Sequence, residues 1–384
     1  MNKILKNVRK NIYWIVVLIL LSLAGVLNLV SWMSNGFCDA YVKYIFPLWG
    51  RIYGLFTGIF PFSVGEIMLY LAVILVILAI ASAIWLLILC VLRKKKRIAD
   101  ILCIYLKIVV MIVAIEAVVM TLNCYMLYHC STFEEKYMPG VKSDRQYSVK
   151  ELADVREMII KRADELAKAM PRDKQGNIIY DGNMADVAVE EMKRMGEQYS
   201  QLSGYYVRPK AFATSDFFSQ QYMMGYYFPF SMEANYNDVM YIANIPATMC
   251  HELSHTKGFI YEDEASFIAY LACISSDDLF FEYSGYLSVL SYINNDLYES
   301  LGKDKELYRQ YMQPSEPVVH DRVFLTKEAW DKVEKSAVID TETVKRASDK
   351  FVETNLILNG VEQGSAVYCD VVDRVLDYYY ADNN

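Results

Sequence analysis

Three long apolar runs occupy the first third of the chain, and they constrain its fold more than any other feature. Residues 12–33 form an uncharged apolar run of 22 residues, long enough for a helix to cross a bilayer. Residues 67–92 and 101–127 form two further runs of similar length. The first run is long for the apolar region of a signal peptide, and no clear small-residue cleavage site follows it. We therefore expect an uncleaved membrane anchor of three transmembrane helices within residues 1–129.

The uneven distribution of charge indicates the orientation of the spans. Residues 1–129 contain 12 Lys or Arg and four Asp or Glu, whereas the rest of the chain contains 26 basic and 42 acidic residues. Basic residues cluster before the first run and again at Arg93–Arg97, which places both clusters on the same side of a three-span arrangement. Cytoplasmic loops are enriched in Lys and Arg, so we expect a cytoplasmic N-terminus and an extracellular region at 130–384. Protease added to intact cells should then digest residues 130–384.

The remaining composition indicates which partners to expect. Residues 34–66 combine aromatic side chains with Gly and Pro, and we expect them to lie at the outer leaflet in contact with membrane lipid. Residues 130–384 are acidic, and phosphate binding needs a basic face, so nucleic acid is not expected as a partner. None of the eight cysteines forms a CxxC pair, and no disulfide framework is predicted.

Residues 130–384 have the pattern of one globular domain in which helices dominate. The aromatic stretch at 205–242 is predicted to be rich in strands, and the polar stretch at 171–182 to be a turn. This combination predicts an α+β fold. Helical periodicity marks residues 147–170, 183–201, 246–257, 262–275, 283–300, 326–334, 343–356 and 365–380.

The segment His251-Glu252-Leu253-Ser254-His255 contains the pattern HExxH. On a helix, His251 and His255 lie on one face, so both imidazoles can bind one zinc ion. Glu252 projects beside the metal, where it can take a proton from a zinc-activated water and pass it to the leaving group. Two of the chain's four histidines stand at this spacing between uncharged flanks. This concentration favours a zinc site over a chance pattern on a solvated helix face.

A catalytic zinc needs a third protein ligand, and the nearest acidic residues follow a glycine. Gly258 is expected to end the first helix in a left-handed cap, so that a second helix can begin soon after it. Glu262 or Glu264 would then point back to the metal. Glu262 is preferred, because Ala265 follows it at a spacing that lets two helices pack closely. The alternative interpretation is an acidic first helical turn that complements the helix dipole.

These residues resemble the zincin superfamily of metallopeptidases, and its glutamate-ligand branch (gluzincins) more than its third-histidine branch (metzincins). Tyr261 stands where a metzincin would carry its third histidine, although Gly258 is placed as in metzincins. The chain more closely resembles an uncharacterised bacterial family of membrane proteins, in which N-terminal spans precede a domain with HExxH and an acidic DEA-type motif. Ser266 stands where this pattern is expected to have Asn. The resemblance rests on Pro61–Glu66, Tyr227–Phe230, Glu233–Asn237, His251–His255, Asp263–Ala265, Tyr283–Tyr286 and Asn359–Val361.

The motif and the resemblance together imply a zincin-like fold and a zinc metallopeptidase of a bacterial cell membrane. Its substrate would be polypeptide in the cell envelope or outside the cell. In zincins an edge strand beside the active-site helix holds extended peptide, and residues 225–242 are the candidate segment here. Glu233, Asn235 and Asn237 alternate along that segment, and they either contact substrate or cap turns.

The transition state of peptide hydrolysis also needs a donor for its oxyanion, and Tyr283 and His320 are the candidates. Two other functions stay open. A non-enzymatic membrane sensor or peptide-binding scaffold would use the same fold, although a binding module has no need of Glu252. An intramembrane protease would need HExxH inside a span, and the charged residues within 245–275 disfavour it.

Overall fold

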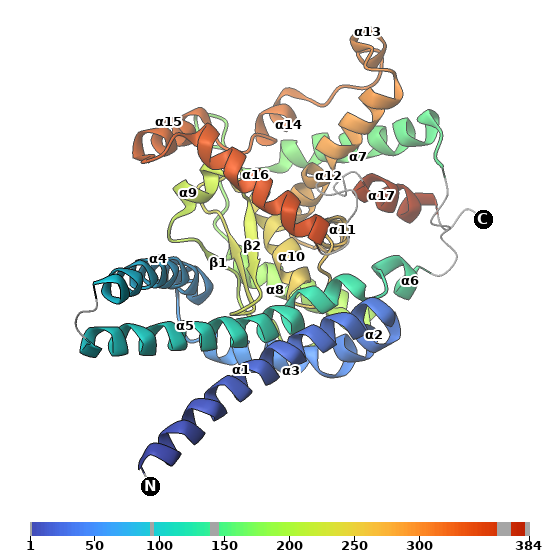
Figure 1. The fold of residues 1–384 in the computed structure, drawn as a ribbon. Helices are drawn as coiled ribbons and strands as arrows, with labels where there is room; N and C mark the ends of the chain where they lie inside the picture. The colour runs from blue at the N-terminus through green and yellow to red at the C-terminus, as the bar shows by residue number, and fades with distance from the viewer. Residues whose placement is uncertain (1, 93–95, 139–145, 359–369, 381–384) are drawn as a thin grey trace.

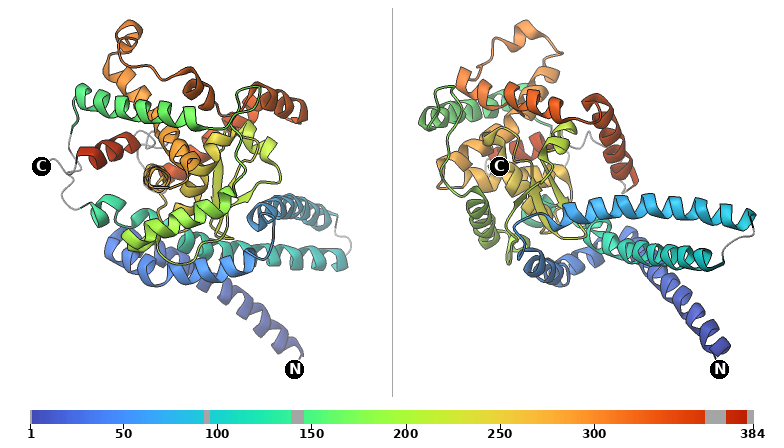
Figure 2. Two further views of the ribbon diagram at one scale, coloured as in Figure 1. Left: turned by 180° about the vertical axis from the view of Figure 1, so that it is seen from behind. Right: turned by 90° about the vertical axis from the view of Figure 1, so that its left-hand side faces the viewer.

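Three long apolar helices form the membrane module at one side of the molecule (Figure 1). They are α1 (Asn2–Met33), α4 (Val64–Val91) and α5 (Lys96–Asn123). Helix α5 packs against both α1 and α4, and Figure 2 shows α4 alongside α5 while the N-terminal end of α1 diverges from them. The predicted spans are thus confirmed as helices long and apolar enough to cross a membrane. The computed structural model describes residues 2–92, 96–138, 146–358 and 370–380.

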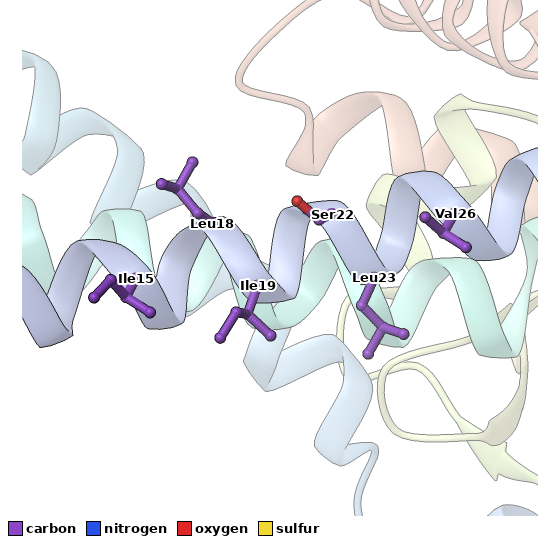
Figure 3. A pocket seen from close by; sticks show the side chains of 6 residues that line it. All are labelled: Ile15, Leu18, Ile19, Ser22, Leu23 and Val26. Atoms are coloured by element: carbon purple, nitrogen blue, oxygen red, sulfur yellow. The ribbon is translucent and has the colours of Figure 1, made fainter.

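The outward surface of these helices is apolar. Little of each candidate span is buried inside the protein. Such a surface would promote aggregation in water, whereas the hydrocarbon core of a bilayer solvates it. The outer face of α1 is an example in which apolar side chains surround one serine (Figure 3): Ile15, Leu18, Ile19, Ser22, Leu23 and Val26.

The connection between the first two spans folds into two short helices, α2 (Asn35–Tyr44) and α3 (Phe46–Thr57). One side of this pair is buried against the rest of the protein through Tyr41, Val42 and Phe46. The other side of α3 is apolar and exposed, and its residues recur at helical spacing: Leu48, Ile52, Leu55 and Phe56. This arrangement suits a helix that lies between a folded region and the membrane interface, as residues 34–66 were expected to do.

Helices dominate the C-terminal region from residue 130 onward. Capping boxes and side-chain caps begin several of them, for example Ser148 with Glu151 at the start of α7. The helical core consists of α10 and α11 packed against α12 and α8, with α12 covered by α7 and α17. The longer helices are α7 (Val149–Ala169), α8 (Met184–Gln198), α10 (Ile245–His255), α11 (Glu262–Ile274), α12 (Leu279–Ser300), α15 (Lys327–Ser336), α16 (Thr341–Leu358) and α17 (Asp370–Tyr380).

These eight helices agree with the eight predicted periodic stretches, although residues 365–369 of the last one lie outside the described residues. Short helices were not predicted, because one or two turns carry too little periodicity to recognise. They are α6 (Phe133–Tyr137), α9 (Ser215–Gln220), α13 (Lys305–Tyr308) and α14 (Glu316–Asp321), together with 3-10 turns η1 (Tyr125–His129), η2 (Ser200–Leu202) and η3 (Ile242–Asn244).

One small mixed sheet accompanies the helices. Strand β3 (Glu233–Tyr236) lies between β1 (Lys210–Ala211), which is parallel to it, and β2 (Gly225–Phe228), which is antiparallel. The prediction that residues 205–242 are rich in strands was therefore wrong over most of their length. Their aromatic side chains instead pack into clusters around α9, where Phe212 and Phe218 stack with ring centroids 3.8 Å apart.

Two buried carboxylates join this sheet to the beginning of α4. Glu233 Oε2 accepts a 2.6 Å hydrogen bond from the backbone N–H of Gly65, and Glu233 Oε1 accepts one of 2.5 Å from Lys210 Nζ. In the opposite direction, Glu66 of α4 accepts hydrogen bonds from the backbone N–H groups of Ala213 (2.7 Å) and Thr214 (3.0 Å). The membrane module and the C-terminal region are thus connected through reciprocal hydrogen bonds at the N-terminus of a span.

The ion pair between Lys210 and Glu233 predicts a large effect of one substitution. Lys210→Met leaves the Glu233 carboxylate buried without its cation, and breaking a buried pair in this way costs about 3–5 kcal/mol. Thermal unfolding of the whole chain in detergent should therefore begin at a clearly lower temperature. Lys161→Met is the matched control, because its pair with Glu157 is exposed and worth at most about 0.5 kcal/mol. Equal melting temperatures for the two variants would contradict this account.

Candidate metal centre

The HExxH segment forms the C-terminal half of helix α10, most of which is buried. Pro246 stands in the first turn, where its missing N–H costs no hydrogen bond. The helix ends at His255, and Gly258 adopts the left-handed φ of +90° that the sequence predicted. The N–H of Phe259 returns to the carbonyl of Ser254 at 3.4 Å, which reverses the chain. Helix α11 can then begin at Glu262 beside the histidines.

Three potential ligand atoms converge at this reversal. His251 Nε2 lies 3.0 Å from Glu262 Oε2 and 3.1 Å from His255 Nε2, and His255 Nε2 lies 3.7 Å from Glu262 Oε2. Zinc bonds of 2.0–2.1 Å at tetrahedral angles place neighbouring ligand atoms about 3.3 Å apart. The three observed separations bracket that length. The side chains of His251, His255 and Glu262 therefore fit three corners of a tetrahedral metal site.

The second ring nitrogen of each histidine is engaged by protein. His255 Nδ1 lies 2.7 Å from the carbonyl oxygen of Phe259, to which it can only donate. His251 Nδ1 lies 3.2 Å from the hydroxyl of Ser266. Such contacts orient the rings of metal-binding histidines and leave the Nε2 lone pairs free for an ion. Ser266 thus occupies the supporting position for which the sequence pattern suggested Asn.

Glu252 lies between the histidine pair and strand β2. Its side chain is buried, and its Oε2 accepts no hydrogen bond from any described residue. Burial raises the pKa of Glu252 to about 8. A Cβ atom at Gly225 would lie 2.7 Å from Glu252 Cγ and 2.8 Å from the backbone oxygen of Asn235, so glycine lets β2 approach the carboxylate. Glu252 is therefore beside the cluster, but it is not one of its three converging ligands.

Glu262 and the histidines form a tightly coupled group. Burial alone would raise the pKa of Glu262, but hydrogen bonds and charge interactions with His251 and His255 outweigh it and lower that pKa. Burial likewise disfavours the charged form of His255, and Glu262 outweighs it to raise that pKa to about 9. The carboxylate of Glu262 is consequently ionised at neutral pH, as a metal ligand must be.

Three other candidates from the sequence lie elsewhere. Glu264 is buried with its Oε1 accepting a 2.8 Å hydrogen bond from the backbone N–H of Phe133, and burial raises its pKa to about 8. The hydroxyl of Tyr283 donates to Asp321 Oδ2 at 2.8 Å, and His320 Nδ1 lies 3.0 Å from Asp321 Oδ1. The structure therefore does not bring Glu264, Tyr283 or His320 into the histidine cluster.

The polar side chains of β3 and of Asn237, which follows it, form hydrogen bonds within the protein. Glu233 contacts α4 as described above. The side-chain amide of Asn235 donates to the backbone carbonyls of Glu233, two residues earlier, and of Tyr226 on β2, and that of Asn237 donates to Ser219 Oγ at 2.8 Å and to a backbone carbonyl. All three side chains are fully buried. They order the sheet and its turns, which was one of the two predicted roles.

Tyr226 on β2 was not identified from the sequence. Its side chain is 36% exposed. Burial of the hydroxyl, and to a smaller extent the neighbouring carboxylates of Glu252 and Glu262, raise the pKa of Tyr226, which therefore stays protonated at neutral pH. The position beside Gly225 in the candidate edge segment was a possible signal, but one tyrosine among 31 is not conspicuous.

Strand β2 presents a backbone edge next to this cluster. Among the described residues, none pairs with the side of β2 that faces away from β3. The N–H of Asn237 donates to the carbonyl of Met224 at 2.7 Å, which identifies the hydrogen-bonded positions of the antiparallel pair. The alternation of such pairs turns the N–H and C=O groups of Gly225 and Tyr227 away from β3. Gly225 is partly exposed, whereas Tyr227 is buried, so an added extended peptide can pair with this edge at Gly225.

Comparison with known proteins gives one match. Residues 41–376 match a family described as "Protein of unknown function (DUF3810)", so the match extends from α2 to α17 and includes the histidine cluster. No curated protein and no solved structure matches the chain. The expected resemblance to an uncharacterised family over most of the chain is confirmed, and its description supplies no activity.

The geometry predicts the metal content of the whole chain purified in detergent. We expect one zinc ion per chain, and loss of most of it in His251→Ala or Glu262→Gln, because each change removes one of three protein ligands. Glu264→Gln is the matched control and should keep its zinc, because Glu264 faces Phe133. Metal analysis of the purified variants measures this. Stoichiometric zinc in a His251→Ala/His255→Ala double variant, or zinc lost from Glu264→Gln and kept in Glu262→Gln, would refute the assignment.

Proposed function

The chain belongs to the DUF3810 family of proteins of unknown function, and from this premise we propose that it is a membrane-anchored zinc-dependent metallopeptidase. One observation carries the proposal. His251, His255 and Glu262 place three ligand atoms within 4.8 Å of one another, and the buried carboxylate of Glu252 lies beside them with an oxygen that lacks a described partner. Two histidines, one glutamate ligand and an adjacent free carboxylate form the set of groups used by zinc peptidases of the glutamate-ligand type.

The donor set supports a catalytic rather than a structural metal. Structural zinc sites are closed by four protein ligands, whereas catalytic sites use three and keep one position for water or substrate. Among the residues that the structure describes, three ligand atoms converge here. Their side chains are 16%, 6% and 29% exposed for His251, His255 and Glu262, so the cluster is accessible from one side. A zinc ion held there would supply Lewis acidity, polarising the scissile carbonyl and acidifying the attacking water.

The protein groups around this position have complementary roles in peptide hydrolysis. Glu252 is placed to accept the proton of the attacking water and to return it to the departing amine. Its unpartnered oxygen and its raised pKa both suit a group that alternates between the two protonation states. We also propose that the hydroxyl of Tyr226 donates a hydrogen bond to the oxyanion that develops on the carbonyl oxygen.

The open edge of β2 supports a polypeptide as the substrate. An extended peptide can add to this edge through the outward N–H and C=O groups of the partly exposed Gly225. Because Gly225 is also the residue packed against Glu252, a peptide bound there passes the general base. Backbone pairing of this kind recognises the peptide main chain and is largely independent of its side chains.

The role of Glu252 is tested by one isosteric substitution. Glu252→Gln should retain zinc, because Glu252 is not a ligand, and should lower turnover by roughly 10²–10⁴-fold, because the general base is lost. Glu264→Gln is the control, with the same chemical change at a carboxylate outside the cluster. Cleavage of a peptide library by equal amounts of zinc-loaded protein provides the measurement. Equal cleavage by wild type and Glu252→Gln would exclude this residue as the base, and inactive zinc-loaded wild type would favour the peptide-binding scaffold.

The proposed role of Tyr226 predicts a change in kcat that is separate from any change in KM. Loss of one oxyanion donor typically costs about 10²–10³-fold in kcat. Tyr226→Phe should therefore lower kcat by roughly that factor with little change in KM or zinc content, because the ring and the strand remain. Tyr222→Phe removes the hydroxyl from another exposed tyrosine near β2 and serves as the control. A change confined to KM, or an equal loss in both variants, would assign Tyr226 to substrate binding or packing instead.

A further inference from the structure

The loop between the helices that carry the candidate ligands contacts α2, α3 and the segment that follows α5. Residues 256–261 connect α10 to α11, and their central residue Gly258 packs closely on α2 and α3. A Cβ atom at Gly258 would lie 3.3 Å from Val42 and 3.5 Å from Phe46. The hydroxyl of Tyr261 donates a 2.7 Å hydrogen bond to the backbone carbonyl of Tyr128. Since Tyr261 directly precedes the ligand Glu262, the metal cluster lies next to the segment that follows the third span.

Strand β2 and its turn rest on the end of that same span. Asn123 is the last residue of α5, and its side-chain amide donates a 2.8 Å hydrogen bond to the carbonyl of Pro229. In return, the hydroxyl of Tyr227 donates to the carbonyl of Asn123 at 3.3 Å. Tyr226 interacts electrostatically with Cys124 as well as with Glu252 and Glu262. The peptide-binding edge and the metal cluster therefore both border the last turn of a transmembrane helix.

The outer surface of the supporting helices is suited to lipid. Helix α3 packs its inner side on the C-terminal region, where a Cβ atom at Gly54 would lie 2.5 Å from Val207. Its outer side exposes apolar residues such as Ile52 and Phe56. In Figure 2 (right) the helices α4 and α5 run side by side away from the folded region, and α7 lies at its opposite side. The candidate site adjoins α2, α3 and the end of α5 through the contacts described above.

We infer that the substrate is the juxtamembrane segment of another membrane-anchored polypeptide, cleaved at the extracytoplasmic membrane surface. This inference rests on the proposed peptidase function. A site whose supporting loop contacts the end of a transmembrane helix can reach a second polypeptide where that polypeptide leaves the same bilayer. An extended chain advances roughly 3.3 Å per residue, so the first few residues outside a span reach a site that borders the last turn of one. Anchoring in the same membrane also raises the effective concentration of the substrate.

The experiment uses the whole chain in vesicles of phosphatidylethanolamine and phosphatidylglycerol. The probe is a pool of single-span reporter proteins, each with a randomised 12-residue segment directly outside its span. The same segments are also offered as soluble peptides at equal total concentration. We expect zinc-loaded wild type to cleave the anchored segments at least tenfold faster, since confinement to one membrane raises the effective concentration toward the millimolar range. Glu252→Gln is the inactive control in both formats.

Reporters with spacers distinguish two causes of faster cleavage, which are the distance of the segment from the membrane surface and its attachment to the same membrane. A rigid helical spacer of about 20 residues lifts the randomised segment by roughly 30 Å, whereas a flexible Gly/Ser spacer of equal length lets it return to the surface. The rigid spacer should abolish the advantage of the anchored reporters, and the flexible spacer should retain it. Equal cleavage of rigid and flexible reporters, or of anchored and soluble segments, overturns the inference while leaving the peptidase function intact. No cleavage of any segment by zinc-loaded wild type overturns both.

The position of the membrane surface has a readout independent of activity. A photo-cross-linking phenylalanine analogue at Phe56, which is 60% exposed on α3, should form adducts with phospholipid. The control is the same analogue at Val338, which is 98% exposed between α15 and α16. Lipid adducts at Phe56 and not at Val338 place the supporting helices at the bilayer surface. Adducts at Val338, or none at Phe56, would put the site away from the membrane and overturn the inference.

Discussion

Much of the structure depends on the hydrogen bonds between the buried carboxylate of Glu233 and the backbone N–H groups at the N-terminus of α4. The N-terminus of a helix carries partial positive charge and unpaired N–H groups, so it stabilises an anion that would otherwise be costly to bury. Lys210 completes the neutralisation from β1. Because Glu233 belongs to the central strand β3, this contact holds the sheet against a transmembrane helix. The register of β2 on β3 then positions Gly225 over Glu252.

The reversal between α10 and α11 combines several requirements in six residues. Gly258 permits the left-handed turn, and the carbonyl of Phe259 at the end of it accepts from His255 Nδ1. Tyr261 attaches the loop to the segment after α5, and Glu262 follows at the beginning of the next helix. The turn that brings the third ligand to the histidines therefore also orients one of them and fixes the whole cluster to the membrane module.

The three consecutive acidic residues that open α11 show how helical geometry separates similar side chains. Successive residues point about 100° apart around a helix, which follows from 3.6 residues per turn. Glu262 faces the histidines, Asp263 Oδ2 accepts a 2.6 Å hydrogen bond from Arg374 of α17, and Glu264 accepts from the N–H of Phe133. One acidic turn thus provides a candidate metal ligand, an ion pair to the C-terminal helix and a cap for α6. The dipole alone does not explain all three.

The sequence by itself determined the three apolar spans, the long amphipathic helices and the placing of His251, Glu252 and His255 on one helix. Each depends on periodicity or length within one segment, which neighbours along the chain suffice to set. Only the tertiary structure showed that Glu262, and not Glu264, lies beside the histidines, and that Tyr283 and His320 both contact Asp321. It also limited the predicted strand-rich stretch to short strands. The approach of Glu262 to His251, and the contact of Glu264 with Phe133 across 131 residues of sequence, depend on how separate helices pack, and no local pattern in the sequence records that packing.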